Sequence, residues 1–262
     1  MRKDCNRLLL IYNLLVSHLL RAGAIAGILL NTALSAQSAS SAQTRQPASA
    51  DTSHVVCSEK PSASRTVRTE VYASPDGHHR AYAEVEARAL SAAQKGQSGP
   101  SCVNNSRLFI ATDNNNFQIA FLQEASDSET GNALRIVDWS ADSRRLLLEL
   151  AQWSYDSPGV TNTPIIFDAR HGVFQHFDLN HALSKQFGVE CSLQVRVSGF
   201  ASDGKIALET QPLSPEEEEV LALPTCAKKK AYWLLSPSSE TLAALPDAAK
   251  ASHNAKIERA DK

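Results

Sequence analysis

Val137-Asp-Trp-Ser-Ala-Asp-Ser143 is an apolar stretch that ends in a small polar turn, and two similar stretches occur elsewhere in the chain. They are Val71-Tyr-Ala-Ser-Pro-Asp-Gly77 and Gly199-Phe-Ala-Ser-Asp-Gly204, and all three lead into a second apolar run. Ser and Asp side chains accept hydrogen bonds from nearby backbone N–H groups, and glycine adopts the positive φ that closes a tight turn. Each stretch therefore predicts a strand, a turn and a second strand. The expected structural turn residues are Asp76, Gly77, Asp142, Asp203 and Gly204, and Ser143 departs from the pattern by replacing a glycine.

A second candidate hairpin follows each of the first ones at a comparable distance. These hairpins span residues 108–121, 164–177 and 230–245, and the turn aspartates of the three units stand 66 and 61 residues apart. Four strands per unit and three units give an all-β, propeller-like domain over residues 65–245, made of three four-stranded antiparallel repeats. A β-sandwich or an incomplete propeller is the alternative.

The turn sequences resemble the TolB-type β-propeller repeat, whose turn commonly reads W-S-P-D-G-R before an apolar strand. The resemblance rests on Trp139–Leu146, Ser74–Gly77 and Phe200–Lys205, and it covers residues 66–245. It implies a propeller-like fold and a noncatalytic role in binding or scaffolding. Units of about 60 residues are longer than WD-type blades, and three blades are fewer than a closed propeller contains. A homodimer in which two chains complete one six-bladed ring would supply the missing blades.

The N-terminal region has the composition of an export signal. Basic residues begin the chain, an apolar region follows, and a small-residue stretch ends at Ala36. We expect residues 1–36 to be a signal peptide, 37–64 a disordered linker and 246–262 a flexible C-terminal tail. The protein is then periplasmic or secreted. The alternative is a membrane anchor formed by residues 8–36, and only an uncleaved N-terminal segment would bring the protein to a membrane.

The cysteines agree with an oxidising compartment. Four remain after residue 36, and they form no CxxC pair, which disfavours a zinc site. Cys57 and Cys191 precede the first strand of their units, and Cys102 and Cys226 stand at the entry to the third strand. Of the three possible connectivities, equivalent positions favour Cys57 with Cys102 and Cys191 with Cys226.

The composition places limits on function without revealing an activity. A formal charge of -2 gives no reason to expect nucleic acid binding. No nucleophile motif is present, so no catalytic residue is assigned, and we expect no cofactor.

The loop that contains Trp153, Tyr155 and Asp156 is the candidate binding site, because aromatic rings offer flat contact surfaces at low entropic cost. We interpret His171, His176 and His181 as surface residues, Asp113–Asn116 as a hairpin turn, and Glu216–Glu219 as part of a solvated loop, so no metal site is predicted. We also expect three aromatic residues to be buried in the core and three repeated glutamates to face solvent. The core positions are Trp139, Phe200 and Trp233, and the solvent-facing ones are Glu84, Glu149 and Glu209.

The sequence favours an exported, noncatalytic module that presents loops to a protein or glycan partner. The alternative is an extracellular hydrolase with acids such as Asp156 and Asp168 on one rim.

Overall fold

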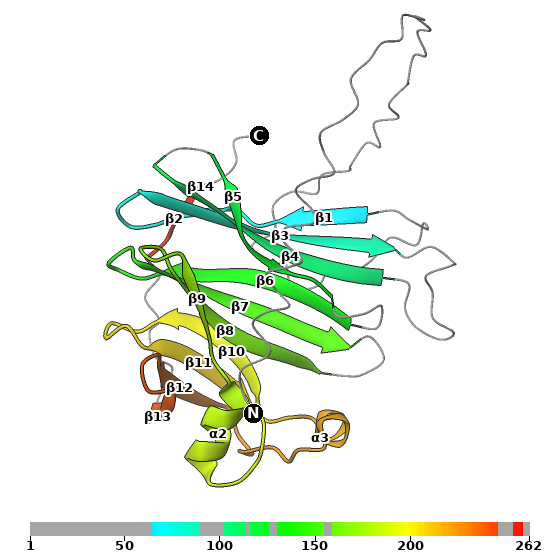
Figure 1. Ribbon diagram of the computed structural model, residues 1–262. Coiled ribbons are helices and arrows are strands. Elements are labelled where there is room, and N and C mark those ends of the chain that lie inside the picture. The colour runs from blue at the N-terminus through cyan, green and yellow to red at the C-terminus, as the bar shows by residue number, and fades with distance from the viewer. Residues whose placement is uncertain are drawn as a thin grey trace, which may run out of the picture. The chain divides into compact units, whose positions relative to one another are not determined.

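The computed structural model describes residues 64–89, 102–113, 116–125, 130–154, 159–245 and 254–258, which form three antiparallel sheets and two short helices (Figure 1). The expected all-β class is confirmed. Neither helix of the described segments has the length and apolarity that a membrane crossing requires. The elements in chain order are β1 (Ser64–Arg68), β2 (Val71–Ala73), β3 (His79–Ala89), β4 (Cys102–Thr112), β5 (Gln118–Gln123), β6 (Thr130–Trp139), β7 (Arg145–Ser154), β8 (Val160–Asp168), β9 (Val173–His176), α2 (Leu179–Phe187), β10 (Gln194–Phe200), β11 (Ile206–Gln211), α3 (Pro215–Leu221), β12 (Ala231–Ser236), β13 (Thr241–Leu245) and β14 (Lys256–Glu258).

The second and third sheets have the four strands that the repeats predict, paired in chain order. The second runs β6-β7-β8-β9 and the third runs β10-β11-β12-β13. Their first two strands match closely: in both, a register shift interrupts the ladder between the second and third residue pairs from the turn. The two hairpins are therefore equivalent residue by residue on both sides of this bulge.

The first sheet has six strands, where four were expected. The strands β1 and β2 follow one another along the same side of β3, and β14 pairs with β2. The sheet thus includes residues 256–258, which lie beyond the boundary expected at Leu245. The approach to β14 is fixed because the backbone N–H groups of Asn254 and Ala255 donate to the carboxylate of Asp138 at 2.9 and 2.8 Å.

The repeated turns have nearly the same hydrogen bonds. The Oγ atoms of Ser74 and Ser140 donate to Oδ1 of Asp76 and Asp142, each at 2.6 Å. In the third turn the carboxylate of Asp203 instead accepts from Lys205, through the backbone N–H and Nζ. These bonds favour the charged carboxylate, so the neighbouring hydroxyl lowers the pKa of Asp76 and of Asp142, and Lys205 lowers the pKa of Asp203.

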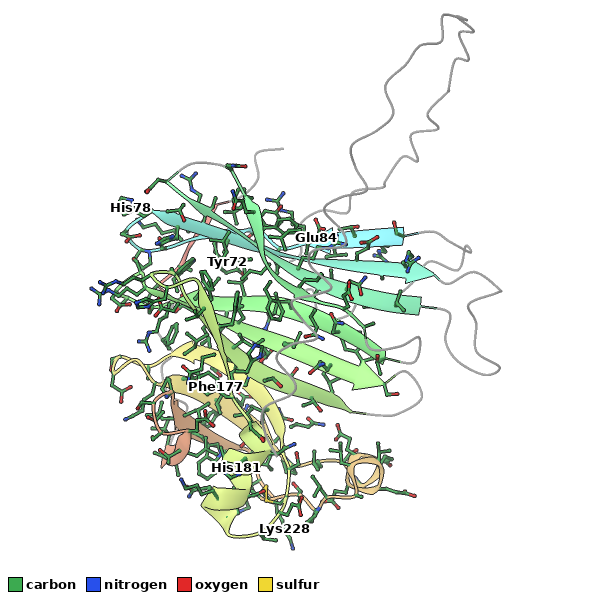
Figure 2. All side chains as sticks on the ribbon, viewed as in Figure 1. Tyr72, His78, Glu84, Phe177, His181 and Lys228 are labelled. Carbon is green, nitrogen blue, oxygen red and sulfur yellow. A yellow bond between two sulfur atoms is a disulfide. The ribbon has the colours of Figure 1, made fainter. Side chains whose placement is uncertain are left out.

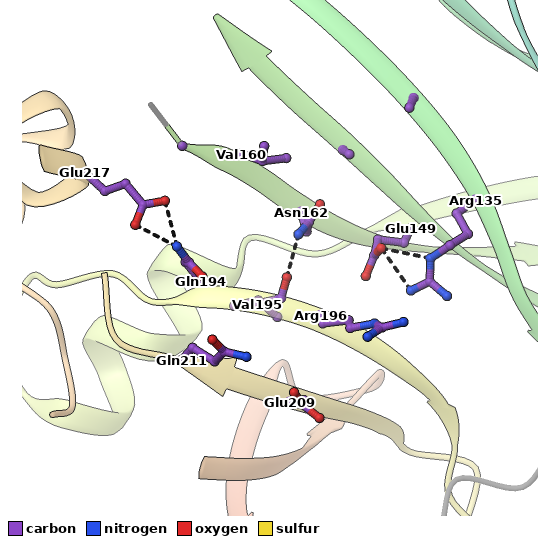
Figure 3. A pocket seen from close by; sticks show the side chains of 13 residues that line it. Arg135, Glu149, Val160, Asn162, Gln194, Val195, Arg196, Glu209, Gln211 and Glu217 are labelled. Atoms are coloured by element: carbon purple, nitrogen blue, oxygen red, sulfur yellow. Dashed lines mark hydrogen bonds and ion pairs between the residues drawn. The ribbon is translucent and has the colours of Figure 1, made fainter. Parts of the chain in front are cut away.

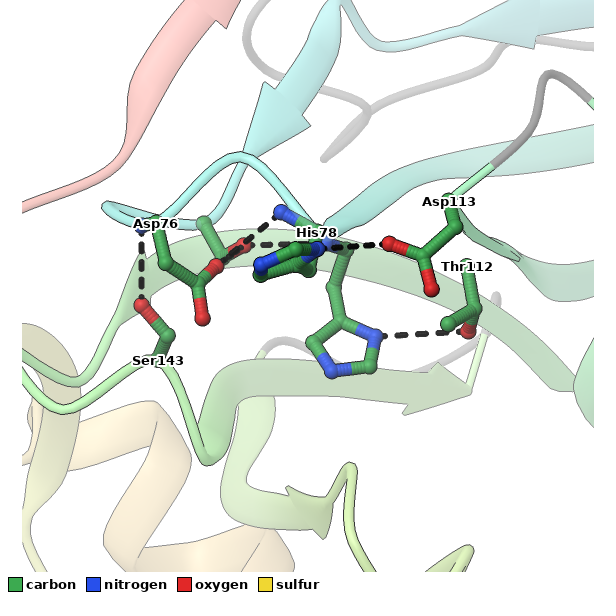
Figure 4. Close-up of polar contacts among 7 residues, drawn as sticks. Asp76, His78, Thr112, Asp113 and Ser143 are labelled. Carbon is green, nitrogen blue, oxygen red and sulfur yellow. Dashed lines mark hydrogen bonds and ion pairs between the residues drawn. The ribbon is translucent and has the colours of Figure 1, made fainter.

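Ser143 departs from glycine for a structural reason. Its φ of 60° lies in the left-handed region, as do the φ values of Gly77 and Gly204 at 81° and 76°. Its Oγ accepts a hydrogen bond of 3.0 Å from the backbone N–H of Asp76, in the preceding turn (Figure 4). Glycine could not supply this acceptor, so the side chain compensates for the less favourable backbone conformation.

Apolar side chains fill the spaces between neighbouring sheets (Figure 2). Trp139 is fully buried between the first and second sheets, and its Nε1 donates to the Tyr72 carbonyl at 3.0 Å. Phe200 and Trp233 belong to the cluster that joins the second and third sheets. The expected core role of all three aromatic residues is confirmed.

A helix and a disulfide flank the third sheet. The helix α2 begins after Asp178, whose carboxylate accepts from the His181 N–H, and ends at Gly188 with a φ of 69°. Its apolar face joins the core of the third sheet. Cys191 and Cys226 form the expected disulfide. The proposed Cys57–Cys102 bond lies outside the described residues, because neither side chain is described.

The acidic run Glu216–Glu219 is helical, so the expectation that it belongs to a solvated loop is wrong. Ser214 and Glu217 form a capping box, since each side chain accepts from the backbone N–H of the other at 3.2 and 2.8 Å. Pro215 at the first helical position and glutamates in the first turn add to this start signal. The run is therefore the first turn of α3, and Glu217 is buried.

Ser143 provides a test of the contact between turns. We expect Ser143→Ala to lower the free energy of unfolding by about 1 kcal/mol, because the Asp76 N–H loses its acceptor. Ser143→Gly should be close to neutral, since it loses the same bond but relieves the left-handed strain. Urea unfolding of both variants measures these changes in the free energy of unfolding. Equal stability of Ser143→Ala and the wild type would contradict the contact.

The turn aspartates predict a direction of pH dependence. Their pKa values are lower in the folded state, so their stabilising contribution is fully present above the unfolded value of about 3.9. It is lost as the pH falls through the folded pKa values. Carboxyl carbon NMR titration should give midpoints below 3.9 for Asp76, Asp142 and Asp203, and a midpoint at or above that value for all three would contradict the turn geometry.

Candidate functional site

A cavity of about 470 Å³ lies where the second and third sheets meet, and it is the candidate site (Figure 3). Strands β6, β7 and β8 form one wall, β10 and β11 form the other, and α3 closes one end. Most of its side chains are charged or carry carboxamide groups. The lining residues are Ala133, Arg135, Glu149, Ala151, Gly159, Val160, Asn162, Gln194, Val195, Arg196, Glu209, Gln211 and Glu217.

The wall from the second sheet binds the free edge of β10. This strand pairs only with β11 within its sheet, so its outward main-chain groups need other partners. Asn162 Nδ2 donates to the Val195 carbonyl at 2.7 Å, and Arg135 Nη2 donates to the Val197 carbonyl at 2.8 Å. The Val197 N–H donates to Oε2 of Glu149 at 2.5 Å. We call Asn162, Arg135 and Glu149 the second-sheet clamp.

The charged pair within this clamp is mostly buried. Arg135 and Glu149 stand directly opposite each other on β6 and β7, and Nε and Nη2 of the arginine donate to Oε1 of the glutamate at 3.0 and 2.9 Å. Their side chains are 20% and 9% exposed. The expectation that Glu149 faces solvent is therefore wrong, because the neighbouring sheet covers it. Glu84 and Glu209 remain partly exposed and pair with Arg107 and Lys230.

Glu217 fixes the end of the cavity beside α3. Both of its carboxylate oxygens accept from Gln194 Nε2, at 2.8 and 2.7 Å. Gly159 has a φ of 112°, and a Cβ there would lie 3.4 Å from Cγ of Glu217. The start of β8 therefore comes close to α3, and a side chain at position 159 would be strained.

The three glutamates that line the cavity have internal partners. Glu149 pairs with Arg135, Glu217 with Gln194, and Glu209 with Lys230 at 2.7 Å. The hydrogen bond from Lys230 lowers the pKa of Glu209. A general acid must hold a proton near neutral pH, whereas the contact with Lys230 favours the ionised form of Glu209. The arrangement offers fixed dipoles and charges, which suits recognition of a ligand.

Of the predicted binding residues, the structure describes Trp153, while Tyr155 and Asp156 lie outside the described residues. Trp153 stands opposite Gly131, and a Cβ on Gly131 would lie 2.4 Å from the indole Cε2. The ring thus lies against the glycine backbone, and it also lines a second cavity of about 470 Å³ that shares Asn162 with the first. Trp153 thus lines a cavity next to the candidate site, and its binding role stays a prediction.

The other polar residues singled out by sequence have local partners. His171 Nδ1 lies 2.8 Å from Oδ2 of Asp168, and this contact lowers the pKa of Asp168. Asp113 lies 2.6 Å from Nδ1 of His78 and raises the pKa of that imidazole (Figure 4). Within the described segments, no three His, Cys, Asp or Glu side chains are grouped so that they could hold a metal ion.

The clamp residues were missed because they come from segments far apart in the sequence. Arg135 and Val197 are 62 residues apart, and Asn162 and Val195 are 33 apart. One signal was present: each repeated glutamate has an arginine opposite it across the strand pair. The pairs are Arg68 with Glu84, Arg135 with Glu149, and Arg196 with Glu209.

Comparison of the chain with protein-family models found no match, and comparison with curated proteins found no relative of significant similarity. The functional interpretation therefore rests on the residues and their geometry.

Removing one member of the clamp tests its contribution. We expect Glu149→Leu to lower the free energy of unfolding by about 3 kcal/mol, because the mostly buried Arg135 and the Val197 N–H lose their acceptor. Combining it with Arg135→Met should recover part of this loss. Glu84→Leu, which breaks a more exposed pair, should cost under about 1 kcal/mol. Urea unfolding compares the three, and equal losses for Glu149→Leu and Glu84→Leu would contradict a buried clamp.

Proposed function

We propose that this protein is an exported, noncatalytic binding module of propeller-like architecture that holds a protein partner at the cavity between its second and third sheets. The observation that carries the proposal is the combination of a polar cavity, whose glutamates have internal partners, with an exposed apolar rim. Val160, which lines both this cavity and the second one, is 37% exposed, and Leu221 of α3, which lines the second cavity, is 41% exposed. Val220, beside Leu221, is also exposed.

Apolar groups around fixed polar groups are typical of protein recognition. A partner would cover the rim and remove apolar area from water, while the polar cavity would set its orientation. A glycan would make less use of Val160 and Leu221, because sugar hydroxyls require hydrogen bonds across most of the contact. These two side chains therefore favour a protein over a glycan.

Export is supported by two features of the chain. The N-terminal composition resembles a signal peptide, and the Cys191–Cys226 disulfide is characteristic of proteins that fold in an oxidising compartment. The resemblance to TolB-type repeats adds support for a scaffolding role. The hydrolase alternative has less support, since the Asp168 carboxylate is bound by His171 and by the backbone of its own turn.

Site-specific photocrosslinking in the native host tests this proposal. A photoreactive residue at Val160 should label one partner protein, which Leu221→Asp should abolish because a charge is placed on the apolar rim. The matched control is the same residue at Val173 on β9, which is 55% exposed and lies outside both cavities.

Equal labelling from positions 160 and 173, or labelling that survives Leu221→Asp, would contradict the proposal. Transfer of the label to carbohydrate alone would replace the protein partner with a glycan.

A further inference from the structure

The third sheet repeats the clamp with which the second sheet holds β10. Counting from the turn, Arg135 and Glu149 are the fourth residue pair of their hairpin, and Arg196 and Glu209 are the fourth pair of theirs. The register shift precedes the pair in both hairpins. The two pairs are therefore equivalent in position, strand and face of the sheet.

The third member of the clamp is also present. Asn162 lies two positions before Pro164, which is opposite Glu149; Lys230 lies two positions before Tyr232, which is opposite Glu209. Both Asn162 and Lys230 offer N–H donors. Lys230, Arg196 and Glu209 therefore supply two donors and one acceptor in the same order as the second-sheet clamp, and we call them the third-sheet clamp.

Within the described structure, the third-sheet clamp holds no main-chain edge. The Arg196 side chain is exposed and interacts electrostatically with Glu209, and Glu209 bonds to Lys230. Arg196 and Glu209 both line the candidate cavity. The contrast with Arg135 and Glu149, which are covered by β10, follows from the absence of a fourth sheet among the described residues.

We propose that the third-sheet clamp binds the edge of an extended strand from a partner polypeptide. Arg196 and Lys230 would donate to two of its carbonyl groups, and Glu209 would accept from one N–H, as in the contact with β10. The inference rests on the proposed function and specifies the structure of the partner at the same site. Main-chain bonds would supply affinity, and the apolar rim would select side chains.

A second copy of this chain is a less suitable occupant. If a second copy extended this series of three sheets, its first sheet would pack on the third-sheet clamp. The contact would use the face of that first sheet that points away from its own second sheet. On that face Arg107 bonds to Glu84 and Glu86 at 3.3 and 2.8 Å, and Arg68 lies 3.4 Å from the centroid of the Tyr82 ring. Burying these paired charges would carry a large desolvation penalty.

A synthetic peptide provides the probe, because the structure shows which strand such a clamp holds. The peptide Leu193-Gln-Val-Arg-Val-Ser-Gly199 copies β10, and fluorescence anisotropy of a labelled form measures its binding to the full-length protein. We expect saturable binding that Arg196→Gln and Glu209→Gln each weaken about tenfold or more. N-methylation of the peptide nitrogen at Val197 should have a similar effect, since it removes the N–H that the glutamate accepts.

The matched controls are Lys185→Gln and Glu190→Gln, which make the same changes of charge at exposed positions outside the cavity. No binding to the wild type overturns the inference, and so does binding that survives the two clamp variants. Binding that survives these variants would also show that the peptide replaces β10 at the second-sheet clamp. A dimer that sedimentation detects and Glu209→Gln dissociates would make a second copy the occupant.

The outcome is separable from that of the proposed function. Labelling from Val160 that persists in Arg196→Gln, without peptide binding, would leave the binding role intact and remove the strand-edge contact. Peptide binding without labelling from Val160 would support the strand-edge contact and contradict the proposed binding of a protein partner at Val160.

Discussion

Main-chain groups at the edge of a sheet need hydrogen-bond partners, and this requirement dominates the junction between the second and third sheets. The carbonyl groups of Val195 and Val197 and the N–H of Val197 find those partners in side chains of the second sheet. The same bonds set where β10 lies and hold Glu149 and Arg135 in place. The cavity, its charged lining and the position of α3 all follow from this junction.

The junction between the first and second sheets is stabilised in a different way. There Asn132 accepts from the Ser106 hydroxyl at 2.6 Å and donates to the Asn104 carbonyl at 2.8 Å. Trp139 and Leu108 belong to the apolar cluster of the same junction. The first junction is densely apolar, with the Asp138 carboxylate bound by the backbone that leads into β14, while the cavity at the second junction is lined by several charged side chains. A ligand site is therefore expected at the second junction.

Local patterns in the sequence predicted most of the local structure. The turn aspartates and the buried aromatic residues follow from side-chain chemistry within short segments, and the disulfide between Cys191 and Cys226 follows from comparing equivalent positions of the repeats. The helix α3 could also have been found, because Ser214-Pro215 followed by Glu217 is a capping box with proline at the first helical position. We interpreted the acidic run by its charge alone and so missed the start signal.

The candidate site required information that a short segment does not contain. Glu149 and Glu209 look equivalent in sequence, yet only the first is covered by a neighbouring sheet, and nothing local distinguishes them. Likewise, β14 joins the first sheet because Asp138, 116 residues away, binds the backbone of Asn254. Such contacts depend on how the sheets pack. The cross-strand arginines opposite the repeated glutamates were the one available clue.

Hydrogen exchange at the Val197 amide tests the clamp most directly. This N–H points away from β11, and an unprotected edge amide would exchange rapidly with solvent. If Glu149 accepts it, the amide should be protected to nearly the same degree as amides in the interior of the third sheet, and Glu149→Gln should reduce that protection selectively. Rapid exchange of Val197 in the wild type would contradict the clamp and the candidate site built on it.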